Sequence, residues 1–494
     1  MGGYLRDIEC LRMKFVNSTK NGFNGDLLSG TIGTVIAYML GFLLLPLVTR
    51  FYKPEHIGAW QIIFGFIALL VPLATLRFES ALVLEKSIKI SKILLSVILI
   101  NTIFIVTSLL FMFFFIGSEK TLILNLEINQ DLFLFSAIGI FLQSIFFVFN
   151  ALIIKHKKFK IQAVGKILRS LSIPIIALFS LLVVDANNTS YIIAGLLAIM
   201  MQGLFLFYFL DKKYFKDLFL LKKSEMKKAI IKYKVYPLYM VPYALSQGAI
   251  WQITLVSLGA LFSASTIGAY TIAKQLVYMP VSLLSTGLRP VIFSYASSAP
   301  RYDNEINDYI YKLLINIINI SIPFGVFAFF YLPDIINFML GEGWEEAGEF
   351  SRWILISAIL AMQTSWLDRM LDVYGRQKLA FLFQVSSDIG LLLILFLCYL
   401  FDASSLITIM SMSIFLAVSE FIWLVMMLNI LRFKIHVLFN IFFRIAIVTV
   451  VLSSLMWLIS YFFEKNYALI IEILILSISS FFVYFQIKKD FSNN

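Results

Sequence analysis

Long apolar segments recur along the whole chain and constrain its fold more than any other feature. Each runs for roughly 17 to 25 residues, long enough for a helix to cross a hydrocarbon core about 30 Å thick. Because backbone groups in lipid must be satisfied internally, these segments are expected to be helices. Charged residues make up only 14% of the chain and hydrophobic residues 60%, whereas a soluble domain carries about 25% charged residues. The sequence therefore predicts an all-α integral membrane protein without a soluble domain.

We predict about fourteen transmembrane helices, arranged as two parallel six-helix lobes plus a C-terminal pair. The predicted spans are 27–48, 59–84, 93–116, 132–154, 167–184, 191–210, 236–262, 267–295, 311–332, 353–371, 379–400, 406–429, 437–461 and 467–487. The corresponding domains are an N-terminal arm (1–26), an N-lobe (27–210), a linker (211–235), a C-lobe (236–429) and a terminal segment (430–494).

Lysine and arginine are distributed unequally between the two sets of loops. Positively charged loops are retained in the cytoplasm. With the N-terminus inside, the inner loops and both tails carry 30 Lys or Arg, and the outer loops carry five. We therefore expect an even number of spans and both termini in the cytoplasm. The other five basic residues lie inside predicted spans, at Arg77, Arg169, Lys274, Arg289 and Arg444.

The loop 211–235 is the most basic segment, with nine lysines interleaved with apolar residues. This pattern predicts an amphipathic helix on the inner membrane surface, and a solvated linker is the alternative. The net charge of +11 is otherwise spread over short loops. A nucleic-acid partner needs its basic residues on one solvated face, so we expect no nucleic-acid binding.

Two segments of the chain resemble each other and indicate a duplication. Ile57-Gly58-Ala59-Trp60 opens the second predicted span, and Ile267-Gly268-Ala269-Tyr270 opens the eighth. Each segment then runs to a proline, Pro72 or Pro280, and on to a Leu-Arg pair that ends in Arg77 or Arg289. An even number of spans separates the copies, so the predicted halves are parallel repeats. Prolines inside spans predict broken helices at matching places, which point to a transport path. Chance similarity in so apolar a chain is the alternative.

Several stretches also match a known sequence pattern. LLLPLVTRFYKPEHIGAW and LRFESALVL place an Arg, an aromatic residue and a Glu at the end of the second span. The seventh span opens with Tyr236-Pro237-Leu238-Tyr239 and then Pro242. Two later stretches are IGAYTIAKQLVYMPVSLLSTGLRPVIFSYAS and FMLGEGWEEAGEFSRW. From about residue 27 to 372, the chain resembles the polysaccharide repeat-unit (O-antigen type) flippases of the multidrug/oligosaccharidyl-lipid/polysaccharide exporter superfamily.

That resemblance implies a V-shaped two-lobe transporter, not an enzyme, in the bacterial inner (cytoplasmic) membrane. It would move an undecaprenyl-diphosphate-linked oligosaccharide from the inner to the outer leaflet by alternating access, for surface polysaccharide such as lipopolysaccharide. The implied partners are this polyprenyl-diphosphate-linked oligosaccharide and the lipid bilayer, with the polysaccharide polymerase machinery as a further expected partner. Members of the family often have twelve spans. Two more, as in the related lipid II flippases, leave the subfamily open.

A diphosphate that crosses a membrane needs positive partners. Arginine binds phosphate with two parallel hydrogen bonds, and lysine acts as a point charge. We expect Arg77 and Arg289, near the cytoplasmic side, to receive the diphosphate. Lys274 and Arg50, near the outer side, are expected to guide it outward. The alternative is that these side chains snorkel to the membrane surface.

Snorkelling is the interpretation that we favour for Arg169 and Arg444, because both lie close to predicted inner loops.

Coupling to an energy source is the next question. The sequence has no G-x-x-x-x-G-K-[ST] loop, so ATP hydrolysis within the chain is not expected. Asp388 and Glu420 fall near mid-membrane in the eleventh and twelfth spans. Carboxylates at this depth are predicted to bind a proton or Na⁺ and couple its gradient to transport. Structural hydrogen bonding between helices is the alternative, and no cofactor is expected.

Other functions fit the sequence less well. An ion-coupled exporter of small molecules from the same superfamily shares the expected fold. A membrane polysaccharide polymerase would need catalytic residues on large extramembrane loops, and the sequence lacks such loops. Cys10 and Cys398 are too few for a disulfide framework. His56, His156 and His436 lack metal-ligand spacing, so we expect surface positions and no metal.

Overall fold

The structure is a computed structural model in two compact units, Met1–Gly268 (unit 1) and Ala269–Asn494 (unit 2). It describes residues 39–433 except 116–120, 124–125, 129, 157, 217–222, 299–303 and 369, together with residue 36 and a few positions within 443–455. The predicted N-terminal arm, the last predicted span and most of the thirteenth lie outside the described residues.

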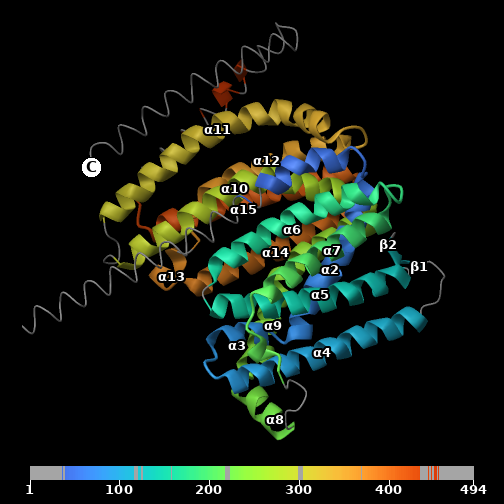
Figure 1. Cartoon of the computed structure of the whole chain (residues 1–494). Coiled ribbons are helices and arrows are strands. Elements are labelled where there is room, and N and C mark those ends of the chain that lie inside the picture. Colours follow the sequence, from blue (N-terminus) through green and yellow to red (C-terminus); the bar gives the residue numbers. More distant parts are fainter. Residues whose placement is uncertain are drawn as a thin grey trace, which may run out of the picture. The chain divides into compact units, whose positions relative to one another are not determined.

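Unit 1 is built from helices that follow one another along the chain (Figure 1). An apolar helix, Met39–Thr49, precedes the labelled elements. The labelled elements are α2 (Pro54–Thr75), α3 (Phe78–Leu84), α4 (Ile88–Phe115), α5 (Gln130–Lys155), α6 (Phe159–Ser180), α7 (Asn188–Tyr208), the 3₁₀ turn η1 (Lys212–Tyr214), α8 (Lys223–Lys232), the π-helical turn η3 (Tyr236–Met240), α9 (Val241–Leu261) and the first turn of α10 (Ala264–Ser298).

A short antiparallel hairpin connects α4 and α5. Its strands, β1 (Thr121–Ile123) and β2 (Leu126–Ile128), pair Thr121 with Ile128.

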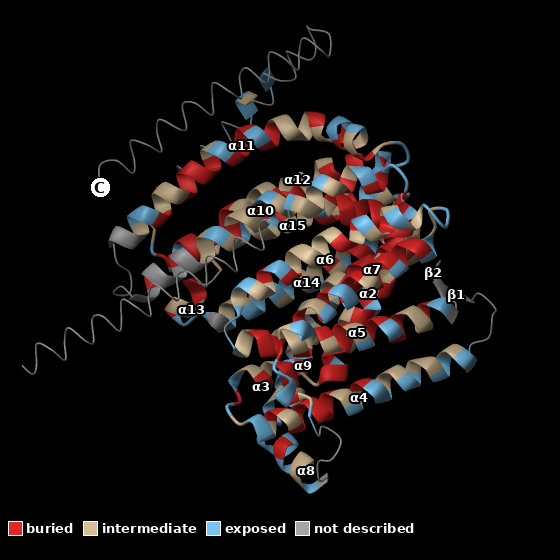
Figure 2. Ribbon diagram, in the orientation of Figure 1, coloured by how far each residue is buried: buried red, intermediate tan, exposed pale blue. Residues whose placement is uncertain are grey.

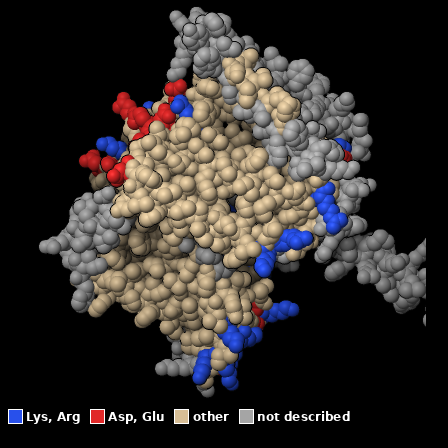
Figure 3. Space-filling view, turned by 180° about the vertical axis from the view of Figure 1, so that it is seen from behind, with Lys and Arg blue, Asp and Glu red and all other residues tan. Residues whose placement is uncertain are grey.

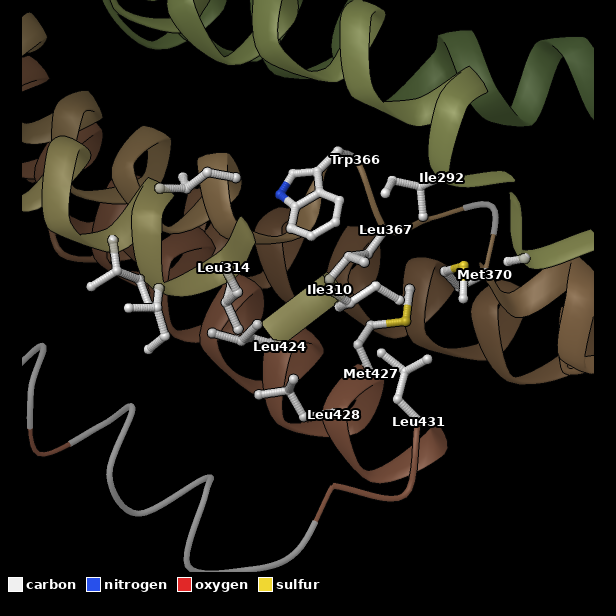
Figure 4. Close-up of a cluster of buried hydrophobic side chains, with 14 of the residues drawn as sticks. Ile292, Ile310, Leu314, Trp366, Leu367, Met370, Leu424, Met427, Leu428 and Leu431 are labelled. Carbon is white, nitrogen blue, oxygen red and sulfur yellow. The ribbon is translucent and has the colours of Figure 1, made fainter. Parts of the chain in front are cut away.

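The described part of unit 2 contains the rest of α10 and five further helices. These are α11 (Asn304–Leu340), α12 (Glu345–Thr364), α13 (Met370–Tyr374), α14 (Gln377–Leu400) and α15 (Ser405–Ile430). Their core gathers the C-terminal part of α10, α11, the turn after α12 and α15 (Figure 4). Trp366 and Leu424 are fully buried there. Because this core joins segments far apart in sequence, it fixes the helices of the unit against one another.

Local sequence sets several helix ends. Pro54 begins α2, where its fixed φ suits a first helical turn. Asn187 caps α7. Its side chain accepts a hydrogen bond from the Ser190 N–H at 2.8 Å, and the Ser190 hydroxyl accepts one from the Asn187 N–H. Pro237 lacks a backbone N–H, and the chain forms the π-turn η3 there before α9 begins.

The prediction of an all-α membrane fold is confirmed. Within the described residues, eight helices are long and apolar enough to cross a membrane, and two shorter apolar helices accompany them. The number fourteen stays a prediction. The second predicted span divides into α2 and α3, and the tenth into α12 and α13. The predicted domain boundaries also stay predictions; in the structure α9 packs against α2, and unit 1 extends to Gly268.

The helix surfaces show what surrounds the protein. On α4, Phe104, Phe111 and Phe114 are each more than 60% exposed, and exposed positions follow the outer side of the helix (Figure 2). In Figure 3 the charged side chains of the described residues form a few separate groups, and most of the described surface is uncharged. So large an exposed apolar surface suits lipid and would be a liability in water.

Candidate functional site

The first copy of the repeat ends in a break between α2 and α3. Leu76 and Arg77 have left-handed φ values of 53° and 57°, which are costly for residues that carry a Cβ. The break leaves carbonyls near the end of α2 without helical donors. Those of Leu73 and Ala74 accept hydrogen bonds from Asn101 Nδ2 at 2.8 and 2.9 Å. A polar side chain of α4 therefore caps the broken helix.

Arg77 has a carboxylate partner within this break. Its Nη1 lies 3.2 Å from Oε1 of Glu79, and its backbone N–H donates to the Thr75 hydroxyl at 3.3 Å. The Glu79 side chain is only 8% exposed, and that of Arg77 is 31% exposed. The pair is thus a local feature of the chain, since only Phe78 lies between its members.

The second copy of the repeat keeps its helix. α10 runs without interruption through Pro280 and Arg289 to Ser298, so the prediction of matching breaks is wrong for this copy. Arg289 donates from Nε and Nη2 to the carbonyl of Ser365 at 3.1 and 2.6 Å, and its Nη2 lies 2.9 Å from Oδ2 of Asp368. Pro290 and Val291 follow this arginine, so its carboxylate comes from a distant segment and not from a neighbour in sequence.

Lys274 lies in α10 between two tyrosines. Its Nζ is 3.5 Å from the Tyr270 hydroxyl and 5.6 and 5.7 Å from the ring centroids of Tyr270 and Tyr278. The Tyr278 hydroxyl in turn pairs with the Ser357 hydroxyl at 3.1 Å, from α12. Ring faces stabilise an ammonium group. Arg50, by contrast, is exposed in the turn before α2.

The repeated glycines approach each other inside unit 1. A Cβ added to Gly58 would overlap the carbonyl oxygen of Ala264, and one added to Gly268 would overlap that of Pro54. Each glycine thus sits against the carbonyl four residues before the other. Only a residue without a side chain fits at such a backbone contact. This reciprocal packing gives a structural reason for the repeated Ile-Gly-Ala sequence.

Arg169 lies deeper than the sequence suggested. The fifth predicted span began at residue 167, but α6 begins at Phe159. The prediction began too late because Lys160 and Lys166 lower the hydropathy of the first turns of the helix. At about 1.5 Å per residue, Arg169 lies roughly 15 Å along this helix. Its guanidinium contacts side chains of α2, α5 and α7. The snorkelling interpretation is therefore wrong for Arg169, and Arg444 lies outside the described residues.

The two predicted coupling carboxylates have different surroundings. Oε2 of Glu420, on α15, accepts a hydrogen bond from the Thr364 hydroxyl at 2.5 Å, at the end of α12. Asp388 accepts one from Gln384 at 2.9 Å, one turn earlier on the same helix, α14. Glu420 therefore links two helices, whereas Asp388 is bonded within one.

The basic linker is tied to the ends of the helices of unit 1. Its helix, α8, is shorter than the predicted amphipathic segment. Lys232 Nζ lies 2.8 Å from Oε2 of Glu85, and the Tyr233 hydroxyl donates to the same oxygen. Lys89 pairs with Glu225 at 2.7 Å. Burial opposes ionisation of Glu85, but hydrogen bonds from Lys232, Tyr233 and the backbone N–H of Ser87 outweigh it and lower its pKa to about 2.

His56 is another residue that the sequence placed incorrectly. It is buried in the first turn of α2, where its Nδ1 accepts a hydrogen bond from the Lys53 N–H at 3.2 Å. A side chain that caps its own helix start has a structural role. His156 pairs with the Tyr214 hydroxyl at 3.2 Å, and His436 lies outside the described residues.

Sequence reasoning also missed four polar residues that the structure brings into contact with basic side chains or with open backbone carbonyls. Their shared signal is a polar side chain within an apolar or short connecting segment, and they are Glu85, Asn101, Gln143 and Gln202.

Comparison with known proteins adds two findings. A family model described as polysaccharide biosynthesis protein matches residues 47–349. No curated protein sequence matches the chain.

Solved structures share the fold. The chain is similar to the lipid II flippase MurJ in an inward closed conformation, with a TM-score of 0.67 and 16% identity over 93% of this chain and 99% of that one. It is also similar to an inward-facing multidrug resistance MATE family transporter of the MOP superfamily, with a TM-score of 0.53 and 14% identity over 82% of this chain and 94% of that one. At these identities the likeness establishes the fold.

Proposed function

Because this chain belongs to the polysaccharide biosynthesis protein family, we propose that it is a flippase for an undecaprenyl-diphosphate-linked oligosaccharide. The substrate would move from the inner to the outer leaflet of a bacterial cytoplasmic membrane, with both termini of the protein in the cytoplasm. The observation that carries the proposal is the fold shared with a lipid II flippase along nearly the whole of both chains. Such a protein would also work beside the polysaccharide polymerase machinery.

The basic side chains of the helices support a phosphate-bearing substrate. In this proposal Arg77 and Arg289 receive the diphosphate, and Lys274 and Arg50 guide it outward. Both arginines already contact a carboxylate. A phosphate oxygen would therefore replace a carboxylate oxygen, which exchanges one charge-assisted hydrogen bond for another. The displaced carboxylate would then need a proton or another cation, and alternating access would carry the bound head group across.

An ion gradient would supply the energy. Glu420 is the stronger of the two coupling candidates because it joins α15 to the end of α12 through Thr364. Binding of a proton or Na⁺ at Glu420 would change that contact and so affect two helices together. Asp388 would act only on its own helix, α14.

Deletion of the gene, with the lipid-linked sugar followed in each leaflet, tests the proposed function. We expect total lipid-linked oligosaccharide to rise while the share reached by a lectin from outside intact spheroplasts falls to background. A plasmid copy of the gene should restore the external share. If the external share stays normal while polymer is lost, the protein acts after translocation, and a polymerase would be the better assignment.

Arginine variants test the loading step. We expect Arg77→Ala and Arg289→Ala each to lower the rate of flipping in proteoliposomes about tenfold or more, the effect of losing one charge-assisted contact of about 1.5 kcal/mol or more. The matched control is Arg352→Ala, which removes an arginine that also pairs with a carboxylate, Glu349. Rates equal to wild type in both test variants, at equal protein levels, would remove these residues from the substrate path.

A further inference from the structure

The described partners of Arg169, in unit 1, are all neutral. Arg169 lies near the middle of α6, a helix of 22 residues that is long enough to cross a bilayer. The remaining basic residues of this helix, Lys160 and Lys166, lie closer to its start. A charge at this depth costs roughly 2.5–3.5 kcal/mol on insertion scales, so its presence calls for a reason.

Three neighbouring helices surround the guanidinium group. Nη1 of Arg169 lies 3.4 Å from Oε1 of Gln143 on α5 and 3.5 Å from Oε1 of Gln202 on α7. The Cζ atom is 5.8 Å from the ring centroid of Phe64 on α2 and 5.9 Å from that of Phe146 on α5. Both glutamines are at most 6% exposed. Amide oxygens and ring faces thus orient the positive group.

These contacts leave most of the charge unbalanced. Both hydrogen bonds are longer than the usual 2.7–3.2 Å for an N–H donor and an oxygen. Among the ion pairs of the described residues, none includes Arg169. Arginine does not release its proton under any ordinary condition. Arg77 and Arg289, in contrast, each contact a carboxylate. Arg169 is therefore the better prepared of the three to accept an anion.

Arg169 is also not fully enclosed by the protein. Arg169 is half-buried among the helices that it contacts, and the residue keeps part of its surface accessible. A group in a closely packed core would keep none. Phe64 and Phe146 frame the charge with apolar rings, and this low-dielectric setting strengthens any attraction to an anion.

We propose that Arg169, oriented by Gln143 and Gln202, is a mid-membrane binding site for a lipid-borne phosphate group. This inference rests on the proposed function, in which the phosphate belongs to the undecaprenyl diphosphate of the substrate. Two parallel N–H donors of the guanidinium match two phosphate oxygens. Arg169 lies roughly 15 Å along α6, near the middle of the membrane. The phosphate would therefore bind there after loading and before release.

Binding of undecaprenyl diphosphate to the purified full chain in phosphatidylcholine nanodiscs tests the site. We expect Arg169→Gln to weaken binding at least tenfold, since hydrogen bonds to charged groups contribute about 1.5–3 kcal/mol. The matched control is Lys160→Gln, which removes a positive charge from the exposed start of the same helix and should leave the affinity unchanged. Undecaprenol, which lacks phosphate, should bind wild type and Arg169→Gln equally.

A second variant keeps the proposal testable if Arg169→Gln does not fold. Arg169→Lys preserves the charge but cannot form two parallel hydrogen bonds, so binding several-fold weaker than wild type is expected. Adding phosphatidylglycerol identifies the source of the phosphate. If it competes with undecaprenyl diphosphate in wild type but not in Arg169→Lys, the site accepts phospholipid head groups as well.

Two results would overturn the site: wild-type affinity in every Arg169 variant that folds, or an equal loss in the Lys160→Gln control. Flipping measured on the same preparations separates this inference from the proposed function. If the wild-type protein binds undecaprenyl diphosphate through Arg169 but does not flip it, the binding site is supported and the proposed flippase function is contradicted. If the Arg169 variants bind and flip undecaprenyl diphosphate as the wild type does, the flippase function is supported and the site at Arg169 is contradicted.

Discussion

The two copies of the repeat agree at their glycines and differ at their arginines. Gly58 and Gly268 each rest against a backbone carbonyl of the other copy. Arg77, however, lies in a helix break and pairs with Glu79, two residues away. Arg289 lies in an unbroken helix and pairs with Asp368, 79 residues away.

This difference shows which residues of the repeat are constrained by close backbone packing. A contact between two backbones allows no side chain on either, so both glycines are constrained together. An arginine needs only a carboxylate within reach, and either a local or a distant one will satisfy it. At the helix break of the first copy, Glu79 is the local partner of Arg77 and Asn101 caps the open carbonyls.

Substitution of either repeated glycine by alanine should have the largest effect, and it tests whether the two copies pack reciprocally. We expect Gly58→Ala and Gly268→Ala to destabilise the protein by similar amounts, about 3 kcal/mol or more each, because the new methyl group overlaps a backbone carbonyl that cannot rotate away. Thermal unfolding in detergent measures the loss. The control is Gly203→Ala, a buried helical glycine with no neighbour in the way of a Cβ. A large loss in only one of the two variants would show that the contact is not reciprocal.

Carboxamide variants sharpen the contrast between the arginines. Glu79→Gln should lower the free energy of unfolding by about 1–3 kcal/mol, because it leaves Arg77 beside a buried neutral group. Asp368→Asn should cost less than about 1 kcal/mol, because both members of its pair are about two-fifths exposed. The Ser365 carbonyl also continues to accept from Arg289. Urea unfolding of both variants in one detergent compares them, and a greater loss for Asp368→Asn would reverse the ranking.

The smallest expected effect concerns Glu85, which follows α3 and attaches the linker to the first copy only. Its pKa of about 2 lies below the ordinary value of 4.5. The attachment is therefore fully present above pH 4.5 and is lost as the pH falls towards 2. Glu85→Gln should release α8 at any pH.

A spin label at Lys228, in a variant without Cys10 and Cys398, reports the motion of α8. We expect low mobility from pH 7 to 4.5 and rising mobility below, with Glu85→Gln mobile throughout. A label at Ser404, which caps α15 in unit 2, should not respond. Equal mobility of the label on α8 in wild type and Glu85→Gln at neutral pH would contradict the attachment.

Sequence patterns predicted the fold well and the site in part. Apolar runs located the described helices from α2 to α15, since hydropathy depends only on the composition of each segment. The repeat was visible because its glycines are constrained on both sides. The position of Arg169 was misjudged because two lysines lower the hydropathy at the start of α6. Gln143 and Gln202 are visible in the sequence as polar residues in two apolar helices. Their role could not be predicted, because only the structure places them beside Arg169.

The sequence alone thus determined that the chain is a helical membrane protein with a duplicated Ile-Gly-Ala segment, because both features depend on residues next to one another. Only the tertiary structure decided which positive charges have a carboxylate beside them. Arg77 finds one two residues away, Arg289 finds one on a distant segment, and Arg169 is surrounded by glutamines and phenylalanines from other helices. The physical reason is that an ion pair depends on distance in space, which hydropathy along the chain does not encode.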